Sequence, residues 1–359
     1  MFKHEYLSID IGNQVIKLLY GHYRSAQLRI KGFSLLAVPE NSVQEGRLIN
    51  TPEIAHRLAN EIKNNSFNPK EIVFTLAGSS VISRIIQLPK STEKEVKQIL
   101  AFEASQFFPI DLKDYVFDYR IMDDINTREG EFTRIMLIAI PEKQADEYME
   151  LGALLGIKVA AITAHPDCMF KLVAQKHLLY SPALLDKGQD ANYVIIDLGQ
   201  WNVKASIFSR QILQSDRTLP VGIRDLDTAI MQTLQMDAAE ADTYKRNRLD
   251  LANNEDITLA TNPTDAIQAV IMKILYDVNR FIDFYKSNNY AQDIDKIYLC
   301  GGGSQIMGIS TLVSQYFNTE VEVIEKSQIA NLIYKKAENQ SDFEDKIRFL
   351  IPAMGALIR

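Results

Sequence analysis

The feature that most constrains the fold is a hairpin pattern that occurs twice in the chain. Residues 6–12, YLSIDIG, form an apolar strand that ends in Asp10 and Gly12, and residues 15–20, VIKLLY, lead back out. Residues 193–199, YVIIDLG, repeat the pattern and return as residues 203–208, again with a lysine in the outgoing strand. A repeat at so long a spacing indicates a duplicated domain rather than a solenoid of short units.

Between the two hairpins, residues 84–163 have the pattern of a small inserted subdomain. Ser91 and Thr92 begin a helix that stops at Pro109, strands follow at 115–122 and 132–140, and a helix at 142–155 leads into a strand at 157–163. This β-α-β-β-α-β order and its length suit an insertion with its own core.

The rest of the chain divides around a polar linker. A helix is expected over 164–180, the linker over 181–191, and further helices over 224–235, 238–247 and 264–288. We therefore expect four parts: 1–83 with 164–185 as a first subdomain, 84–163 as the insertion, 191–235 with 290–359 as a second subdomain, and 236–289 as a smaller helical subdomain.

Charge and cysteine usage exclude several classes of function. The net charge of −7, without a long basic run, argues against a nucleic-acid partner. Cys168 and Cys300 are far apart, which fits a reducing compartment and offers no metal-like spacing. No signal-peptide core is seen, and the longest apolar stretches are too short to cross a bilayer. We expect a soluble cytoplasmic protein that reaches a membrane only through a partner.

The two hairpins have the chemistry of a phosphate site. Glycine lets a backbone approach phosphate oxygens closely and present its N–H groups to them. A carboxylate at the end of the strand can hold a hydrated Mg²⁺. Asp-x-Gly is also ordinary turn chemistry, and its recurrence is what favours a site. We expect Asp10 and Asp197 to hold Mg²⁺ through water, and the phosphate-binding residues to be these two with Gly12, Asn13, Gln14, Lys17, Gly199, Gln200, Trp201 and Asn202.

Two later segments could bind an adenosine group. Gly301, Gly302, Gly303 and Ser304 follow the strand predicted at 295–300, and such a turn lets a flat base lie against the backbone. Within the helical segment 239–247, Asp242 and Lys245 lie three residues apart, with Arg246 beside them, and could reach a ribose and a purine. A flexible connection and a solvated helix face with a weak charge pair are the alternatives.

With these elements in this order, the sequence resembles the actin-like ATPase superfamily over essentially its whole length. DIGNQVIK (10–17) and DLGQWNVKASI (197–207) are similar to its two phosphate loops, and IYLCGGGSQIMGI (297–309) to its adenosine loop. AMGALIR (353–359) is similar to its closing helix, where Gly355 would allow close contact. The resemblance implies a duplicated actin-like, ribonuclease H-like α/β fold of two domains with an inserted small α+β subdomain, and ATP with Mg²⁺ as cofactors.

Within that superfamily the chain most resembles the PilM family of type IV pilus assembly, related to the cell-division protein FtsA. QLPKSTEKEVKQILAFEASQFFPIDLKDYVFDYRIM (87–122) and DVNRFIDFYKSNN (277–289) carry the likeness, and the chain ends at Arg359 without an FtsA-like amphipathic tail. The resemblance implies a cytoplasmic scaffold of pilus, or of related type II secretion or competence, assembly.

The same resemblance implies the partners. The N-terminal cytoplasmic peptide of a PilN-like inner-membrane protein would hold the scaffold peripheral to the inner membrane, and pilus motor ATPases are further candidates. The peptide groove is then expected between the inserted subdomain and its neighbour, in the region of Leu88, Phe102, Phe107 and Phe108, although packing in a core also explains these side chains. Self-association is left open.

Several positions depart from the superfamily pattern. Trp201 and Asn202 stand where relatives commonly have small or hydroxyl residues, and Ile223 where they have a second glycine. Asp242 and Asp277 stand where glutamate is common. Hydrolysis of ATP is therefore left open, and no catalytic residue is assigned. A small-molecule kinase, an FtsA-like filament-forming protein and a protein with an empty cleft remain alternatives.

Overall fold

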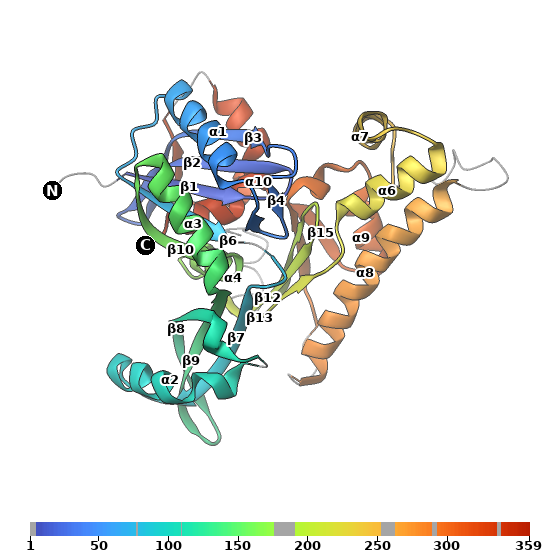
Figure 1. Ribbon diagram of the computed structural model, residues 1–359. Helices are drawn as coiled ribbons and strands as arrows, with labels where there is room; N and C mark the ends of the chain where they lie inside the picture. Colours follow the sequence, from blue (N-terminus) through green and yellow to red (C-terminus); the bar gives the residue numbers. More distant parts are fainter. Residues whose placement is uncertain are drawn as a thin grey trace. The chain divides into compact units, whose positions relative to one another are not determined.

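The computed structural model describes residues 5–76, 78–108, 110–175, 191–252, 263–288, 293–335 and 339–359 (Figure 1). The chain divides into two compact units. The first comprises Met1–Gln175, Asn331–Ala337 and Pro352–Arg359, and the second comprises Lys176–Ala330 and Glu338–Ile351.

The first unit is built on a six-stranded sheet in the order β10-β6-β1-β2-β3-β16. Neighbours are antiparallel within β1-β2-β3 and parallel elsewhere. The strands are β1 (Tyr6–Ile11), β2 (Val15–Arg24), β3 (Gln27–Ala37), β6 (Glu71–Leu76), β10 (Lys158–Ala164) and β16 (Leu332–Tyr334). β1 is buried almost throughout, because helices cover both faces of the sheet.

Helices α1 (Thr51–Asn64) and α3 (Glu142–Leu155) contribute to the core on one face of this sheet. The Asn50 side chain caps α1 by accepting a hydrogen bond from the Glu53 amide, and Ile54, Leu58 and Ile62 recur at helical spacing on its buried side. α3 ends at Gly156 in the left-handed conformation that favours glycine. On the other face, Cys168 of α4 (His165–Ala174) packs with Val73 and Ala356.

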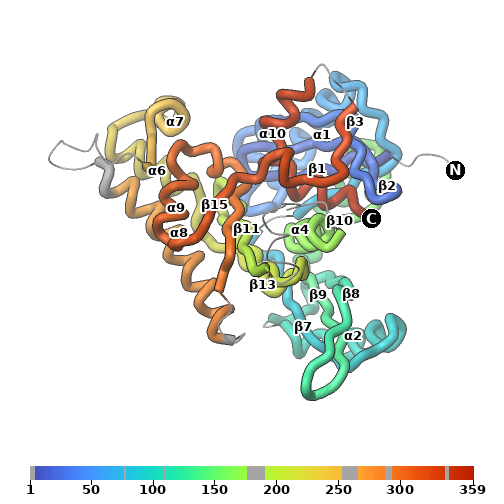
Figure 2. Tube along the Cα trace, turned by 180° about the vertical axis from the view of Figure 1, so that it is seen from behind, coloured from blue at the N-terminus to red at the C-terminus, as the bar shows by residue number. Residues whose placement is uncertain are grey.

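Residues Ile82–Pro141, called the inserted part below, form a three-stranded sheet with a helix on one face. The order is β7-β9-β8, with β7 (Ile82–Pro89), β8 (Tyr115–Thr127) and β9 (Gly130–Pro141). α2 (Glu93–Phe107) lies beside this sheet (Figure 2). It begins with a capping box between Thr92 and Glu95, and its Val96 and Leu100 are buried in the core of the inserted part.

One predicted strand belongs elsewhere than expected. Residues 157–163 were assigned to the insertion by their order in the sequence, but β10 pairs in parallel with β6 in the six-stranded sheet. The inserted sheet therefore has three strands and a single helix. The reason is that the pairing partner of a strand is set by residues far away in the chain, which a local pattern does not contain.

The second unit is built on a five-stranded sheet in the order β13-β12-β11-β14-β15. Its strands are β11 (Asn192–Leu198), β12 (Val203–Ser209), β13 (Ile212–Leu219), β14 (Lys296–Cys300) and β15 (Glu320–Val323). The core between this sheet and its helices contains residues from α6 (Ile223–Leu234), α7 (Ala238–Asn247), α8 (Pro263–Asn288) and α9 (Ile309–Phe317).

The two sheets confirm the predicted duplication. The order β10-β6-β1-β2-β3 in the first unit corresponds to β15-β14-β11-β12-β13 in the second. In each unit the two strands of the Asp-x-Gly hairpin are antiparallel. The first strand of each hairpin also pairs in parallel with a strand from later in the chain, β1 with β6 and β11 with β14. The same arrangement of five strands thus occurs twice.

Some elements differ from the sequence-based expectation. β13 and β16 were not predicted, and α10 (Gln340–Ala356) contains Pro352 in its interior and includes the first residues of the predicted closing helix. The predicted helix end at 176–180, residues 181–190 of the predicted linker, and Pro109 lie outside the described residues.

Candidate functional site

The first hairpin pairs its aspartate with a lysine across the turn. Asp10 lies opposite Lys17 in the β1–β2 register, and Lys17 Nζ is 2.8 Å from Asp10 Oδ2. Asp10 is buried, so the ion pair compensates for a charge that would otherwise be costly in this position. The Gly12 amide donates to the Val15 carbonyl at 3.1 Å, and a Cβ at Gly12 would lie only 2.9 Å from that oxygen. The tight turn therefore needs glycine.

The second hairpin repeats this geometry. Asp197 is buried and lies opposite Lys204, whose Nζ is 3.4 Å from Asp197 Oδ2. A Cβ at Gly199 would lie 2.5 Å from the Asn202 carbonyl oxygen, so this turn needs glycine as well. Lys204 has the same place in its hairpin as Lys17, although only Lys17 was predicted as a site residue.

The predicted glycine segment passes directly over the carboxylate of Asp197. Gly301 has a positive φ of 80°, and a Cβ on it would lie 2.2 Å from Asp197 Oδ1. A Cβ at Gly303 would lie 2.6 Å from Ile223 Cδ1, so Gly303 lets the turn pack on α6. Gly302 is different, because the nearest atom to its Cβ position is Phe349 Cε1 at 3.7 Å. Gly302 is the one of the three with open space beside it.

The side chains of Ser304, Lys245 and Arg246 form hydrogen bonds and ion pairs with other residues of the second unit. The Ser304 hydroxyl donates to the Gly301 carbonyl at 2.7 Å and stabilises the turn. Lys245 is buried, with Nζ 2.5 Å from Asp227 Oδ1 and 3.3 Å from Asp242 Oδ1. Arg246 pairs with Asp242 at 2.7 Å. Partial burial opposes ionisation of Asp242, but hydrogen bonds from Arg246 and Lys245 lower its pKa overall.

Asp227 on α6 joins two of the predicted segments and was not foreseen. Besides Lys245 of α7, it accepts a hydrogen bond from Gln200 Nε2 at 2.7 Å. Gln200 belongs to the second hairpin turn, so one carboxylate connects the turn with α7. Its position in the first turns of α6 gives no local signal of this role, because both partners lie far from it in sequence.

The turn of the second hairpin also packs on the start of α6. The Gly199 and Gln200 carbonyls accept hydrogen bonds from the Ile223 and Arg224 amides at 3.1 and 2.9 Å. The Arg224 guanidinium lies over the ring of Trp201, with its carbon 3.6 Å from the ring centroid. Arg224 is a second residue that the sequence did not single out.

The structure thus brings one set of predicted residues together inside the second unit. They lie around the carboxyl ends of β11 and β14, where open α/β sheets commonly bind ligands. The set comprises Asp197, Gly199, Gln200, Trp201, Asn202, Asp242, Lys245, Arg246, Gly301, Gly302, Gly303 and Ser304. The remaining predicted residues, Asp10, Gly12, Asn13, Gln14 and Lys17, form the equivalent hairpin of the first unit.

A separate groove of about 690 Å³ lies in the first unit beside the inserted part. β8 and β9 contribute Val116, Ile138 and Ile140, and β10 contributes Ala161 and Ile162. β8 and β10 are each the outermost strand of their sheet on this side. Leu88 and Phe108 are core residues under α2, and none of the four residues predicted for this region, Leu88, Phe102, Phe107 and Phe108, lines the groove.

A charged cluster crosses the groove from β8 to α4. Arg120 binds both carboxylate oxygens of Asp167, Lys171 Nζ lies 3.1 Å from Asp167 Oδ2, and the Thr163 hydroxyl donates to the same oxygen at 2.8 Å. Burial alone would raise the pKa of Asp167, but Lys171 and Arg120 lower it. The cluster fastens the inserted part to α4.

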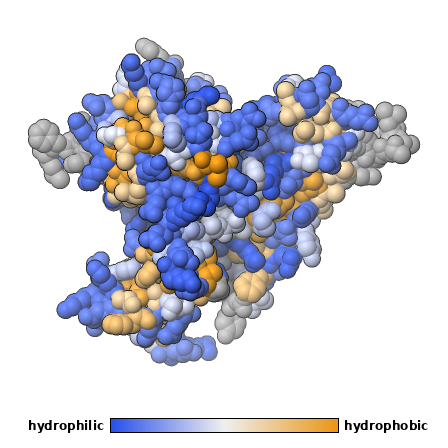
Figure 3. Space-filling view, viewed as in Figure 1, coloured by the Kyte–Doolittle hydropathy of each residue, from blue (hydrophilic) through white to orange (hydrophobic). Residues whose placement is uncertain are grey.

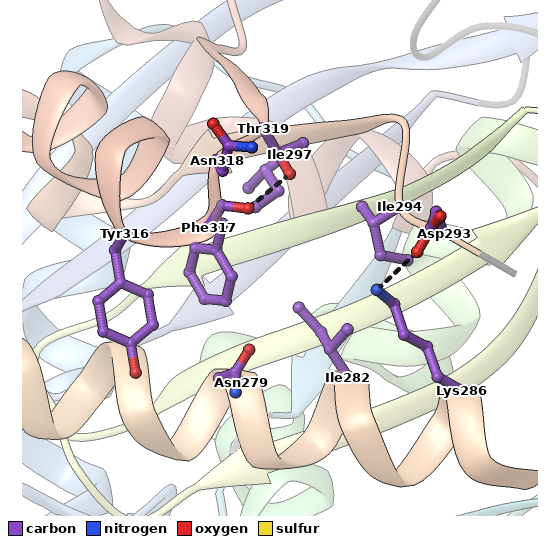
Figure 4. A pocket seen from close by; sticks show the side chains of 10 residues that line it. All are labelled: Asn279, Ile282, Lys286, Asp293, Ile294, Ile297, Tyr316, Phe317, Asn318 and Thr319. Carbon is purple, nitrogen blue, oxygen red and sulfur yellow. Dashed lines mark hydrogen bonds and ion pairs between the residues drawn. The ribbon is translucent and has the colours of Figure 1, made fainter. Parts of the chain in front are cut away.

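A smaller pocket of about 430 Å³ lies in the second unit between α8, α9 and the beginning of β14 (Figure 4). The ion pair of Lys286 with Asp293, at 3.1 Å, lies at one side of it. The pocket is at the amino end of β14, whereas the glycine turn follows its carboxyl end. It is therefore not part of the candidate nucleotide site.

Comparison with known proteins gives one family and two similar structures. Residues 8–359 match the family model described as type IV pilus assembly protein PilM. The chain is similar to a solved structure of the PilM-PilN type IV pilus biogenesis complex, with 19% identity, a TM-score of 0.81, and coverage of 99% of this chain and 98% of that chain. It is also similar to the ethanolamine utilization protein EutJ from Carboxydothermus hydrogenoformans, with 13% identity, a TM-score of 0.55, and coverage of 100% and 91%. These likenesses confirm the actin-like fold class.

Proposed function

The chain belongs to the PilM family of type IV pilus assembly proteins, and we propose that it is an assembly scaffold that binds ATP with Mg²⁺ and a peptide of an inner-membrane partner. The observation that carries the nucleotide part is the repeated hairpin, in which each unit places a buried aspartate, a lysine and a glycine turn in the same arrangement. Each hairpin can contact phosphate groups of a nucleotide through backbone N–H groups and charge.

The chemistry of the hairpins suits Mg²⁺ held through water. Among the residues that the structure describes, no three His, Cys, Asp or Glu side chains gather as a metal site. A single carboxylate, Asp10 or Asp197, would therefore bind water molecules of a hydrated Mg²⁺ whose other ligands are phosphate oxygens. Lys17 and Lys204 would keep each carboxylate in place.

The adenosine part of the proposal rests on the glycine turn. Gly302 is exposed and has open space where a side chain would begin, so a flat base can lie against it. Asp242 and Lys245 support the neighbouring surface through Asp227. We assign no catalytic residue, because Gln200 is bound to Asp227 and Trp201 is packed under Arg224.

Calorimetric titration with Mg-ATP tests the nucleotide site. Asp10→Asn and Asp197→Asn should each weaken binding roughly tenfold, since each removes the charge that attracts Mg²⁺. Gly302→Val should block the base without disturbing the fold, because its surroundings are open. Asp118→Asn, an exposed aspartate of the inserted part, is the matched control. Wild-type affinity in both hairpin variants would refute the two-hairpin model.

The groove beside the inserted part is the proposed peptide site. An extended peptide can add to the edge of an outer strand while its apolar side chains fill an adjoining groove, and β8 and β10 both offer such an edge here. Hydrophobic residues reach the surface of the inserted part, as Figure 3 shows on one face. The proposed occupant is the N-terminal cytoplasmic peptide of a PilN-like protein, the class of partner present in the similar complex.

Two matched variants test this site. Val116→Glu should abolish binding of a synthetic partner peptide, because Val116 lines the groove. Phe102→Glu should leave binding unchanged, because Phe102 is 86% exposed on α2 and outside the groove. Equal peptide affinity in both variants, measured by calorimetry, would place the peptide elsewhere.

The proposed partner also sets the location. No helix in the described ranges is long and apolar enough to span a bilayer. We propose that the protein lies in the cytoplasm and is held peripheral to the inner membrane through the bound peptide. We also propose that it interacts with the pilus motor ATPases. Co-sedimentation with vesicles that carry the partner, compared with vesicles that lack it, measures this directly.

A further inference from the structure

Arg224 is held in a fixed position at the second hairpin. Its backbone amide is bonded to the Gln200 carbonyl at 2.9 Å, and its guanidinium carbon lies 3.6 Å from the centroid of the Trp201 ring. At this distance the planar cation stacks on the indole face. A long side chain that would otherwise sample many rotamers is therefore ordered before any ligand arrives.

The charge of this guanidinium has no close acceptor among the described residues. The nearest carboxylate oxygen, Asp225 Oδ1, is 3.7 Å from Arg224 Nε, and Asp225 Oδ2 already accepts from the Gly222 amide at 3.1 Å. Asp227, the next acid on α6, is occupied by Lys245 and Gln200. No hydrogen bond from the guanidinium is found within the described ranges, and 39% of the side chain is exposed. Its donors are thus ordered, accessible and unused.

The first amides of α6 and the lysine of the hairpin are already hydrogen-bonded within the unit. A helix start normally presents free N–H groups, but the Ile223 and Arg224 amides of α6 are bonded to the Gly199 and Gln200 carbonyls. Lys204 is engaged with Asp197. Among the cations described around this turn, Arg224 is the one whose side chain makes no hydrogen bond to a carboxylate.

We propose that Arg224 binds a phosphate group of the nucleotide and that Trp201 is the positioning residue that holds it there. The inference rests on the proposed nucleotide binding and adds a residue to that site. The planar fork of a guanidinium matches two phosphate oxygens, so stacking on the indole leaves the edge of the fork free for them. This arrangement explains why a bulky tryptophan stands in a phosphate-binding turn. Its ring holds the Arg224 guanidinium, which would then contact the phosphate.

The test compares ATP binding by the full chain with that of three variants. Arg224→Gln should weaken ATP binding about tenfold, because one charge-assisted contact is lost. It should also reduce the steepness with which ATP affinity falls as salt rises, since one fewer cation faces the phosphates. Arg224→Lys keeps the charge but lacks the planar guanidinium, so its ATP affinity should lie between those of the wild type and Arg224→Gln. Arg280→Gln, which removes an exposed arginine beside the Tyr276 ring on α8 of the same unit, should match the wild type.

Trp201 supplies a second readout of the same contact. It is the single tryptophan of the chain, so intrinsic fluorescence reports this turn alone. Adding ATP should change its emission in the wild type, and Arg224→Gln should remove the response. Trp201→Leu should weaken ATP binding in the same direction as Arg224→Gln, although it leaves the arginine in place.

The outcomes separate this inference from the proposed function. If the wild type does not bind ATP, both fail. If the wild type binds ATP and Arg224→Gln binds it equally well, nucleotide binding stands and Arg224 has no contact with it. If Arg224→Gln weakens binding with an unchanged salt dependence, its role is to support the turn, and the proposal is also overturned. Circular dichroism of each variant verifies that it is folded.

Discussion

Replacing Asp167 by asparagine would remove the negative centre of the cluster that joins β8 to α4. Asp167 is nearly fully buried and binds Arg120, Lys171 and Thr163. Breaking a buried ion pair by removing one partner typically costs about 3–5 kcal/mol. Two features reduce the cost here: asparagine can still accept from the Thr163 hydroxyl, and Arg120 is 41% exposed and can turn to water. We expect a loss of about 2 kcal/mol in the free energy of opening this region.

The pH dependence gives this prediction a second, independent check. The cluster holds the pKa of Asp167 below its ordinary value of 3.8, so the carboxylate stabilises the folded form. That contribution is fully present well above 3.8 and is lost as the pH falls through the lowered pKa of the folded state. The difference in opening free energy between the wild type and Asp167→Asn should therefore be equal at pH 8 and pH 6, and it should become smaller below about pH 4.

Native-state hydrogen exchange followed by mass spectrometry is the suitable assay, because peptides from β8 and α4 report the joint directly. Tryptophan fluorescence would not serve, since Trp201 belongs to the other unit. Asp118→Asn is the control, an exposed aspartate of β8 that lines the same groove. Equal protection of β8 and α4 in the two variants at pH 7 would refute the reasoning, as would a difference that persists undiminished at pH 3.

Three further predictions concern close packing and buried polar contacts. Gly355→Ala should lower the stability of the first unit by roughly 2 kcal/mol in thermal melts, because its Cβ would lie 2.2 Å from the Cys168 carbonyl oxygen, a clash that outweighs the better helix propensity of alanine. Gly301→Ala should weaken Mg-ATP binding in calorimetry and also destabilise the second unit by about 1–3 kcal/mol, since its Cβ would meet Asp197 Oδ1 at 2.2 Å and its φ is positive. The buried Gln144 amide donates to the Gly46 carbonyl at 2.9 Å, and the Tyr148 hydroxyl is the other donor to this oxygen. Gln144→Leu should therefore lower the free energy of unfolding in urea by about 1 kcal/mol. It should also speed proteolysis near β4 (Val43–Gln44) and β5 (Arg47–Leu48).

Elements with a strong local pattern were predictable. The two hairpins follow from apolar strands around an Asp-x-Gly turn, and α2 follows from its capping box and its apolar spacing. β13 was missed because Gln214, Ser215 and Asp216 interrupt its apolar pattern, which an outer strand tolerates. α10 continues through Pro352, a residue that usually ends a helix, because Ala353 and Met354 beyond it are fully buried in the core.

The candidate site was predictable in its parts but not in its connections. Asp10, Asp197 and the glycine turn could be named because aspartate and glycine at the end of a strand have a recognisable chemistry. Asp227 and Arg224 could not, because what makes them notable is their contacts with Gln200, Lys245 and Trp201, which come from other elements.

The sequence by itself was enough to predict the duplication, the two aspartate hairpins and the family, because all three can be recognised from local motifs and the order in which they occur. Only the tertiary structure decided that Gly301 crosses the Asp197 carboxylate and that β10 leaves the insertion for the large sheet. Both depend on parallel pairing between distant strands, β14 with β11 and β10 with β6. Such pairing is chosen by the packing of the whole unit, and no short segment contains it.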